Sequence, residues 1–201
     1  KDEALIHVDH SKELNLIKTT KSNVFIIHGE GGCGKTALIK EYFEQNQNIF
    51  FCRKANELSE CQSIEECLFN CSKDFFSKAF AEEPLKYFVI DSAEKVLDFK
   101  DNSIYFDFIT FLADQQWTII FTTRNSYFEI LLSELFYSLN MKPFSICINP
   151  IETKELNHLL SQHHILLPTD PKLLSLISNP FYLSYYVRFY SSETNNFNYL
   201  D

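Results

Sequence analysis

Hydrophobic positions along the chain follow two patterns, short unbroken apolar runs and longer stretches with apolar residues at helical spacing. An unbroken run is typical of a strand buried on both faces of a parallel sheet, and the longer spacing predicts amphipathic helices. The predicted strands cover residues 23–28, 49–52, 85–91, 117–124 and 144–148. The predicted helices cover residues 37–45, 63–80, 103–114, 126–139, 152–161 and 170–190. Together they indicate an α/β fold built on a five-stranded parallel sheet.

The strands stop well before the end of the chain, which suggests two parts. The α/β unit ends near Pro150, and the stretches after it are helical with no further strand. We therefore expect a nucleotide-binding domain over residues 1–150 and the start of a small helical domain over 151–201. The hydrophobic fraction of 45%, with 15% aromatic residues, argues for a packed globular chain.

The first apolar run leads directly into a glycine-rich loop, Gly29–Thr36, with the sequence GEGGCGKT. All 4 glycines of the 201-residue chain lie in this loop. A strand, a loop of the form GxxxxGKT and a helix, in that order, make up a phosphate-binding P-loop. A glycine-rich turn that binds nothing is the alternative, and the complete motif in this context argues against it. The sequence therefore predicts a nucleotide site.

The residue types of the loop suit this chemistry. Glycine reaches the backbone angles that turn successive N–H groups inward around a phosphate, and the following helix N-terminus adds partial positive charge. We expect Lys35 to contact the β- and γ-phosphates and the Thr36 hydroxyl to bind Mg²⁺. The predicted contacts of the loop are Glu30, Gly31, Gly32, Cys33, Gly34, Lys35, Thr36 and Ala37.

The third predicted strand ends in an acid, Asp91, as in the Walker B pattern that accompanies a P-loop. A carboxylate at the carboxyl edge of a parallel sheet lies where ligands of such sheets bind. We expect Asp91 to hold Mg²⁺. Ser92 follows, and the next acid is Glu94. Two interpretations of Glu94 stay open: it polarises the attacking water, or it only favours the N-terminus of a following helix.

Two further positions are candidate nucleotide contacts. Arg124 ends the fourth predicted strand and is one of three arginines, so we expect it to sense the γ-phosphate. A surface arginine at a helix start is its alternative. Pro180 opens an aromatic helix, and an ordinary helix start is as well supported as a nucleotide contact. The predicted catalytic set is Lys35, Asp91, Glu94 and Arg124.

Charge and composition limit the partners. The net charge of −9 argues against direct nucleic-acid binding by this chain. No apolar run approaches the length of a membrane span and no signal peptide is seen, so we expect a cytoplasmic protein without membrane contact. The six cysteines include no CxxC pair. Metal binding by Cys67 and Cys71, four apart on a predicted helix, is the weaker alternative to buried free thiols.

Four segments, HGEGGCGKTAL, VIDSAEK, IIFTTRN and SNPFYLS, resemble in order and spacing the STAND class of signal-transduction ATPases. They are most similar to bacterial antiviral STAND proteins, and the resemblance covers nearly the whole chain. It implies a P-loop core with strand order 5-1-4-3-2 and a helical lid. It also implies that Pro180 contacts the nucleotide and that Val8 and His10 flank the adenine, so ATP or ADP with Mg²⁺ is the expected ligand.

The resemblance further implies a switch, in which ADP holds a resting monomer and ATP permits self-association. A protein trigger would be sensed by a C-terminal domain outside these 201 residues, in antiviral defence and innate immunity. We expect slow ATP hydrolysis. The alternatives are an AAA+-like ATPase acting on DNA, a nucleotide-bound scaffold without turnover, and a small-molecule kinase, which three scattered arginines fit poorly. No NKxD-type motif for guanine is present.

Overall fold

The computed structural model describes residues 6–46, 48–98 and 101–197, and its contacts divide the chain into two compact units. Residues 12–29 and 35–147 form the sheet unit. The helical unit contains three described segments, residues 6–11, 30–34 and 148–197. The division passes through the glycine-rich loop, whose central residues belong to the helical unit. The predicted boundary at residue 150 stays a prediction.

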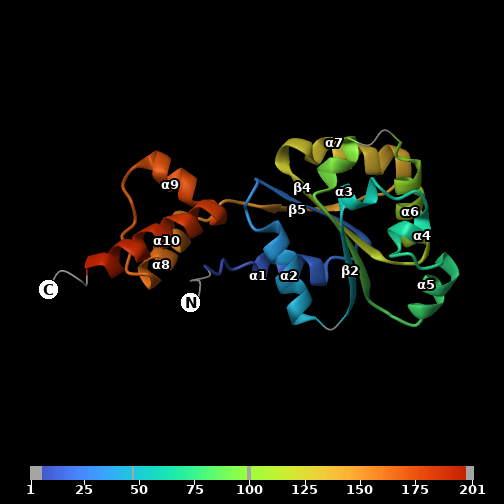
Figure 1. The fold of residues 1–201 in the computed structure, drawn as a ribbon, viewed down its shortest axis with the longest axis horizontal. Helices are drawn as coiled ribbons and strands as arrows, with labels where there is room; N and C mark the ends of the chain where they lie inside the picture. The colour runs from blue at the N-terminus through green and yellow to red at the C-terminus, as the bar shows by residue number, and fades with distance from the viewer. Residues whose placement is uncertain (1–5, 47, 99–100, 198–201) are drawn as a thin grey trace. The chain divides into compact units, whose positions relative to one another are not determined.

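The sheet unit is built on five parallel strands in the order β2-β3-β4-β1-β5, which confirms the predicted strand order (Figure 1). The strands are β1 (Val24–Gly29), β2 (Ile49–Lys54), β3 (Lys86–Asp91), β4 (Thr118–Arg124) and β5 (Phe144–Ile148). β4 lies between β1 and β3, with Val24 opposite Ile119 and Tyr87 opposite Thr118. Parallel neighbours require crossover connections, which the intervening helices supply.

Successive residues of a strand face opposite sides of the sheet, and here both sets are apolar. Both faces of the sheet are therefore covered by helices. Val24, Phe88 and Phe121 join a core cluster with helices on one face. On the other face Tyr42 donates a hydrogen bond of 2.8 Å to Tyr87. The helices of this unit are α1 (Ser11–Thr19), α2 (Lys35–Gln45), α3 (Ala55–Leu58), α4 (Ile64–Cys67), α5 (Lys73–Ala79), the 3-10 helix η1 (Ala93–Asp98), α6 (Ser103–Asp114) and α7 (Asn125–Leu139).

The predicted helix over residues 63–80 is wrong, because the structure has two short helices, α4 and α5, in its place. Phe69 and Asn70 between them have left-handed backbone angles, with φ of 59° and 62°. Ser72 then caps the second helix by accepting a hydrogen bond from the Phe75 N–H. The ring of Phe69 lies 4.1 Å from the Arg53 guanidinium, a tertiary contact that a continuous helix would not make.

The helical unit contains α8 (Thr153–Gln162), α9 (Pro171–Ile177) and α10 (Pro180–Phe197). α10 begins at Pro180, as predicted for the first helical position. Leu156, Leu160, Ile177, Leu183 and Val187 form its core, which Ile6 and Val8 from the N-terminal segment also contact. None of the described helices combines the length and apolar character needed to cross a membrane.

The prediction that the cysteines are buried is wrong for most of them. Cys33 and Cys67 are buried, but Cys52 and Cys147 are exposed and Cys61 and Cys71 are half-buried. Cys52 and Cys147 lie on β2 and β5, the two outermost of the strands that the structure describes. Cys71 lies outside α4, so the two cysteines of the alternative metal pair do not share a helix.

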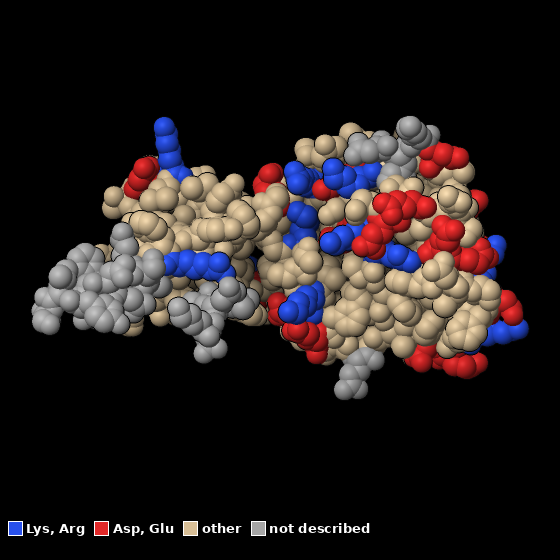
Figure 2. Space-filling model, viewed as in Figure 1, with Lys and Arg blue, Asp and Glu red and all other residues tan. Residues whose placement is uncertain are grey.

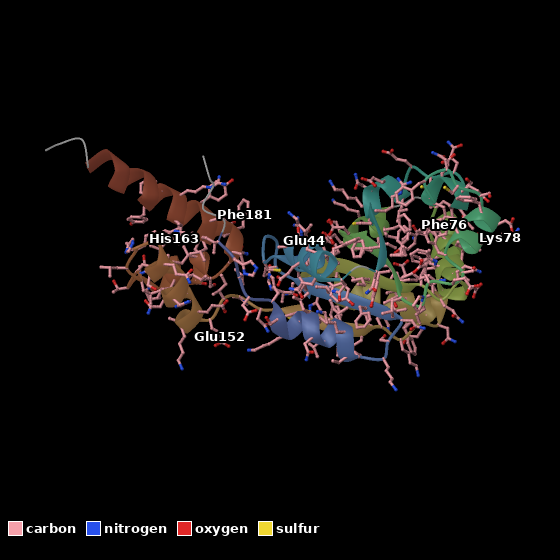
Figure 3. The ribbon with its side chains drawn as sticks, turned by 90° about the horizontal axis from the view of Figure 1, so that it is seen from below. Glu44, Phe76, Lys78, Glu152, His163 and Phe181 are labelled. Atoms are coloured by element: carbon pink, nitrogen blue, oxygen red, sulfur yellow. The ribbon has the colours of Figure 1, made fainter. Side chains whose placement is uncertain are left out.

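Trp117, the only tryptophan, is 1% exposed and lies at the centre of an aromatic cluster within the core of the sheet unit. Its ring centroid lies 5.2 Å from that of Phe76, 5.6 Å from Phe80 and 5.7 Å from Phe51. Figure 3 labels Phe76 among the crowded side chains of the sheet unit. The cluster therefore joins α5 to the sheet.

We expect Trp117→Ala to lower the free energy of unfolding by about 3–5 kcal/mol, because it removes the centre of this cluster and leaves a cavity. Tyr137→Ala is the control, since that side chain is 82% exposed, and should change stability by less than about 0.5 kcal/mol. Urea unfolding followed by circular dichroism measures both. Equal stabilities of the two variants would contradict the assigned core.

Candidate phosphate-binding site

Three neighbouring strands end at the same edge of the sheet, two of them in charged side chains. β1 ends at Gly29, β3 at Asp91 and β4 at Arg124. Gly29 lies opposite Arg124 in the register of β1 and β4. The carboxyl edge of a parallel sheet is where open α/β folds bind their ligands. The carboxyl ends of β1, β3 and β4, which carry the predicted site residues, thus lie at one edge of the sheet.

The glycine-rich loop has the backbone geometry that its sequence predicts. Gly32 and Gly34 have φ of 79° and 103°, in the region that favours glycine. A Cβ on Gly32 would lie 2.6 Å from the Phe181 Cβ, whereas a Cβ on Gly31 would meet nothing within 4 Å. Gly32 is therefore required by both conformation and space, and Gly31 by neither.

Lys35 and Thr36, the last two residues of the loop motif, are also the first two residues of α2. The Lys35 Nζ donates a hydrogen bond of 3.0 Å to the Gly29 carbonyl, so the side chain folds back along the loop. Thr36 and Ala37 are exposed, while Leu38 turns inward and is fully buried. The apolar side of α2 thus fixes the helix against the sheet and leaves its first turn open to solvent.

In the helical unit, His10 packs against the loop. Its imidazole is 5% exposed, and its Nε2 lies 3.1 Å from where a Cβ on Gly34 would be. Val8, two residues earlier, is half-buried against the apolar core of this unit. His10 therefore lies against the loop, whereas Val8 packs against the apolar core of the helical unit.

The turn before α10 also contacts the loop within the helical unit. The Asn179 Nδ2 donates a hydrogen bond of 2.8 Å to the Gly31 carbonyl. The Phe181 N–H donates to the Gly32 carbonyl at 3.3 Å and to the Asn179 Oδ1 at 3.0 Å. Phe181 lies at the start of α10 in Figure 3. Pro180, between them, is half-buried and supplies no N–H, so its neighbours make these polar contacts.

A hollow of about 610 Å³ adjoins the loop inside the helical unit. Its size is within the range of sites for small molecules and cofactors. It combines apolar side chains with one acid, one lysine and several hydroxyl and amide groups. The lining residues are Glu30, Gly31, Cys33, Ile148, Pro150, Lys172, Ser175, Leu176, Ser178, Asn179 and Tyr182.

In the sheet unit Asp91 is held by a threonine that the sequence analysis did not single out. The Thr122 hydroxyl donates to the Asp91 Oδ1 at 2.5 Å. The same Thr122 oxygen accepts a hydrogen bond of 2.9 Å from the Ser92 N–H. Thr122 stands two residues before Arg124 in the TTR sequence. Its position near the end of a strand was the one feature of the sequence that could have indicated a role at the site.

Glu94 and Arg124, predicted separately, form an ion pair. The Arg124 Nε lies 3.4 Å from the Glu94 Oε1, with side-chain exposures of 61% and 10%. The Glu94 Oε2 is buried and has no hydrogen-bond partner among the described residues. A buried carboxylate oxygen without a partner is costly, and sites with such atoms often bind water or a cation.

These features fit a magnesium-bound phosphate group. In the sheet unit the start of α2 offers backbone N–H groups suited to an anion, and Lys35 at that start adds a positive charge. Asp91 and the Thr36 hydroxyl are the oxygen ligands that Mg²⁺ prefers. The partnerless oxygen of Glu94 suits a water near such a group. These donor types are the ones that the predicted nucleotide and metal would need, and the assignment of the site residues stays a prediction.

No family model matches the sequence, and no curated protein matches it. Solved structures do match. A Walker-type ATPase of Pyrococcus abyssi has a TM-score of 0.65 and 12% identity, over 88% of this chain and 65% of that one. AMPPCP-bound DnaA from Aquifex aeolicus has a TM-score of 0.53 and 15% identity, over 85% of this chain and 57% of that one.

A third similar structure is the replication initiator DnaA bound to AMPPCP and single-stranded DNA. Its TM-score is 0.54 and its identity 12%, over 87% of this chain and 57% of that one. The chain spans 57–65% of the length of these three structures. The similarity shows that the chain has the fold of P-loop ATPases.

The loop makes a direct prediction about two adjacent glycines. We expect Gly32→Ala to destabilise the protein by about 1–2 kcal/mol through its left-handed backbone alone, with a further loss from the contact with Phe181. Gly31→Ala, next to it, has open space and should lie within about 0.5 kcal/mol of the parent protein. Urea unfolding of both variants measures the difference. Two equally stable variants would show that the loop conformation is not as described.

Proposed function

We propose that this chain is the ATP- and ADP-binding switch module of a STAND signalling ATPase. The observation that carries the proposal is the convergence of the P-loop, Asp91 and Arg124 on neighbouring parallel strands. Lys35 contacts the β- and γ-phosphates, and Mg²⁺ is held by Thr36 and Asp91. Bound nucleotide supplies the transferable phosphate, and the chain supplies its orientation and charge balance.

In this proposal Arg124 detects the γ-phosphate and Glu94 assists its hydrolysis. Glu94 orients the attacking water through its partnerless oxygen. Arg124, which is largely exposed on a strand end, changes its partner from Glu94 to the γ-phosphate. That exchange releases Glu94 from the ion pair only when ATP is present.

The helical unit responds to nucleotide through the loop itself. Gly31 and Gly32 accept hydrogen bonds from Asn179 and Phe181 at the start of α10. A phosphate that fixes the loop backbone therefore acts on the end of this helix directly. Pro180, His10 and Val8 complete the nucleotide contacts, with the last two near the adenine.

The biological role follows the resemblance of the motifs. ADP holds a resting state, and ATP permits self-association of the module once another domain senses a protein trigger. Defence against phage is the setting that the similarity to bacterial antiviral STAND proteins favours. We propose no direct contact with nucleic acid or membrane, and a cytoplasmic location.

Action on DNA is the competing function, since one of the structures similar to this chain is bound to single-stranded DNA. DNA binding requires clustered positive charge. Figure 2 instead shows Lys and Arg groups beside Asp and Glu groups on the visible face of the sheet unit, and the net charge is −9. The charge pattern favours the switch.

Calorimetric titration with Mg-ATP, Mg-ADP and Mg-GTP tests nucleotide binding. We expect adenine-selective binding that Lys35→Ala weakens about 10- to 100-fold, because it removes a charge-assisted contact. Lys40→Ala is the control, since Lys40 lies exposed on the same helix in a surface pair with Glu44. Loss of binding in both variants, or in neither, would contradict the proposal. Titration with single-stranded DNA decides the competing function.

Arg124 gives a second prediction. Arg124→Ala should weaken ATP binding about tenfold and change ADP binding less than about twofold, because only ATP has the γ-phosphate. Arg188→Ala removes an equal charge from the exposed surface of α10 and should affect neither nucleotide. Competition binding in Mg²⁺ measures both affinities. An equal loss for ATP and ADP would rule out γ-phosphate sensing by Arg124.

A further inference from the structure

Thr122 lies where β4 passes the end of β3, and its hydroxyl has two polar neighbours. Its side chain is 1% exposed. The oxygen lies 2.5 Å from the Asp91 Oδ1 and 2.9 Å from the Ser92 nitrogen. A buried hydroxyl between a carboxylate and a backbone N–H is held from both sides, so its orientation is fixed.

We propose that Thr122 is a positioning residue that sets the orientation of the Asp91 carboxylate for magnesium. The inference rests on the proposed function, since it assigns a role toward the metal that accompanies the nucleotide. Thr122 belongs neither to the glycine-rich loop nor to the acid and arginine already discussed. Thr122 acts through Asp91 and does not contact the nucleotide.

The proton count of the hydroxyl determines the direction of both bonds. A threonine hydroxyl has one proton and two lone pairs. The Ser92 N–H is a donor and must take a lone pair, while the ionised Asp91 carboxylate only accepts. The single proton therefore points to Asp91 Oδ1, and the carboxylate rotation is fixed. The second oxygen, Oδ2, remains for the metal or a water bound to it.

The backbone at Ser92 explains why the bond to its N–H matters. Ser92 has φ of 59°, a left-handed conformation that is strained for a residue with a Cβ. This turn connects Asp91 at the end of β3 to η1, which carries Glu94. By accepting the Ser92 N–H, Thr122 holds the turn in place, so one hydroxyl fixes both the carboxylate and the main chain behind it.

Thr123 provides an internal control for this role. It is the neighbouring residue, has the same side chain and is 0% exposed. Its hydroxyl, however, has no hydrogen-bond partner among the described residues. Replacing either threonine with valine keeps the shape and removes one hydroxyl. Only at Thr122 does that hydroxyl touch Asp91.

The test measures nucleotide binding as Mg²⁺ is increased from zero in EDTA-treated protein. Thr122→Val should raise the Mg²⁺ concentration for half-maximal effect about tenfold or more, since groups that orient a ligand commonly contribute this much. Metal-free nucleotide affinity should stay within about twofold of the parent value. Thr122→Ser, which keeps the hydroxyl, should restore the Mg²⁺ response to within about threefold, and Thr123→Val should match the parent.

Each outcome decides between the role in magnesium binding and a structural one. An unchanged Mg²⁺ response in Thr122→Val overturns the inference, and so does an equal loss of binding with and without Mg²⁺. If circular dichroism shows that Thr122→Val is unfolded, Thr122→Ser and Thr122→Ala answer the same question, because they differ by the hydroxyl alone; equal Mg²⁺ responses overturn it. Absence of nucleotide binding by the parent protein refutes the proposed function instead, at any Mg²⁺ concentration.

Discussion

The candidate site depends on one constraint, the parallel alignment of β1, β4 and β3 as neighbours. Parallel strands that lie side by side end at the same edge, so each contributes its last residues to one place. β1 leads into the loop, β3 ends in Asp91 and β4 ends in the Thr122–Arg124 segment. The buried apolar faces that hold the sheet together therefore also bring these polar ends together.

The candidate site also depends on close packing around two glycines of the loop, Gly32 and Gly34. Positive φ at Gly32 and Gly34 makes any side chain there strained, and the Phe181 Cβ lies against the first of them. His10 lies against the other. The central residues of the loop, Glu30–Gly34, are thus packed within the helical unit.

Local pattern predicted most of the fold. The ranges of α2, α6 and β5 follow from apolar spacing and the loop, and the strand order follows from the resemblance of the motifs. The break at Phe69 and Asn70 was not predictable, because the contact with Arg53 comes from a distant strand. The pairings of Thr122 with Asp91 and of Glu94 with Arg124 were also missed, since they join residues about thirty positions apart. The amide contact of Asn179 with the loop was not predictable either, because it joins residues far apart in the sequence.

The most direct test of the central claim uses the glycines themselves. All 4 lie in the loop, so protein labelled with ¹⁵N only at glycine gives an amide spectrum that reports on that loop alone. Adding Mg-ADP and then Mg-ATP should shift all of these signals, with different end points for the two nucleotides. Signals that stay in place at millimolar nucleotide would show that this loop does not bind phosphate and would contradict the account.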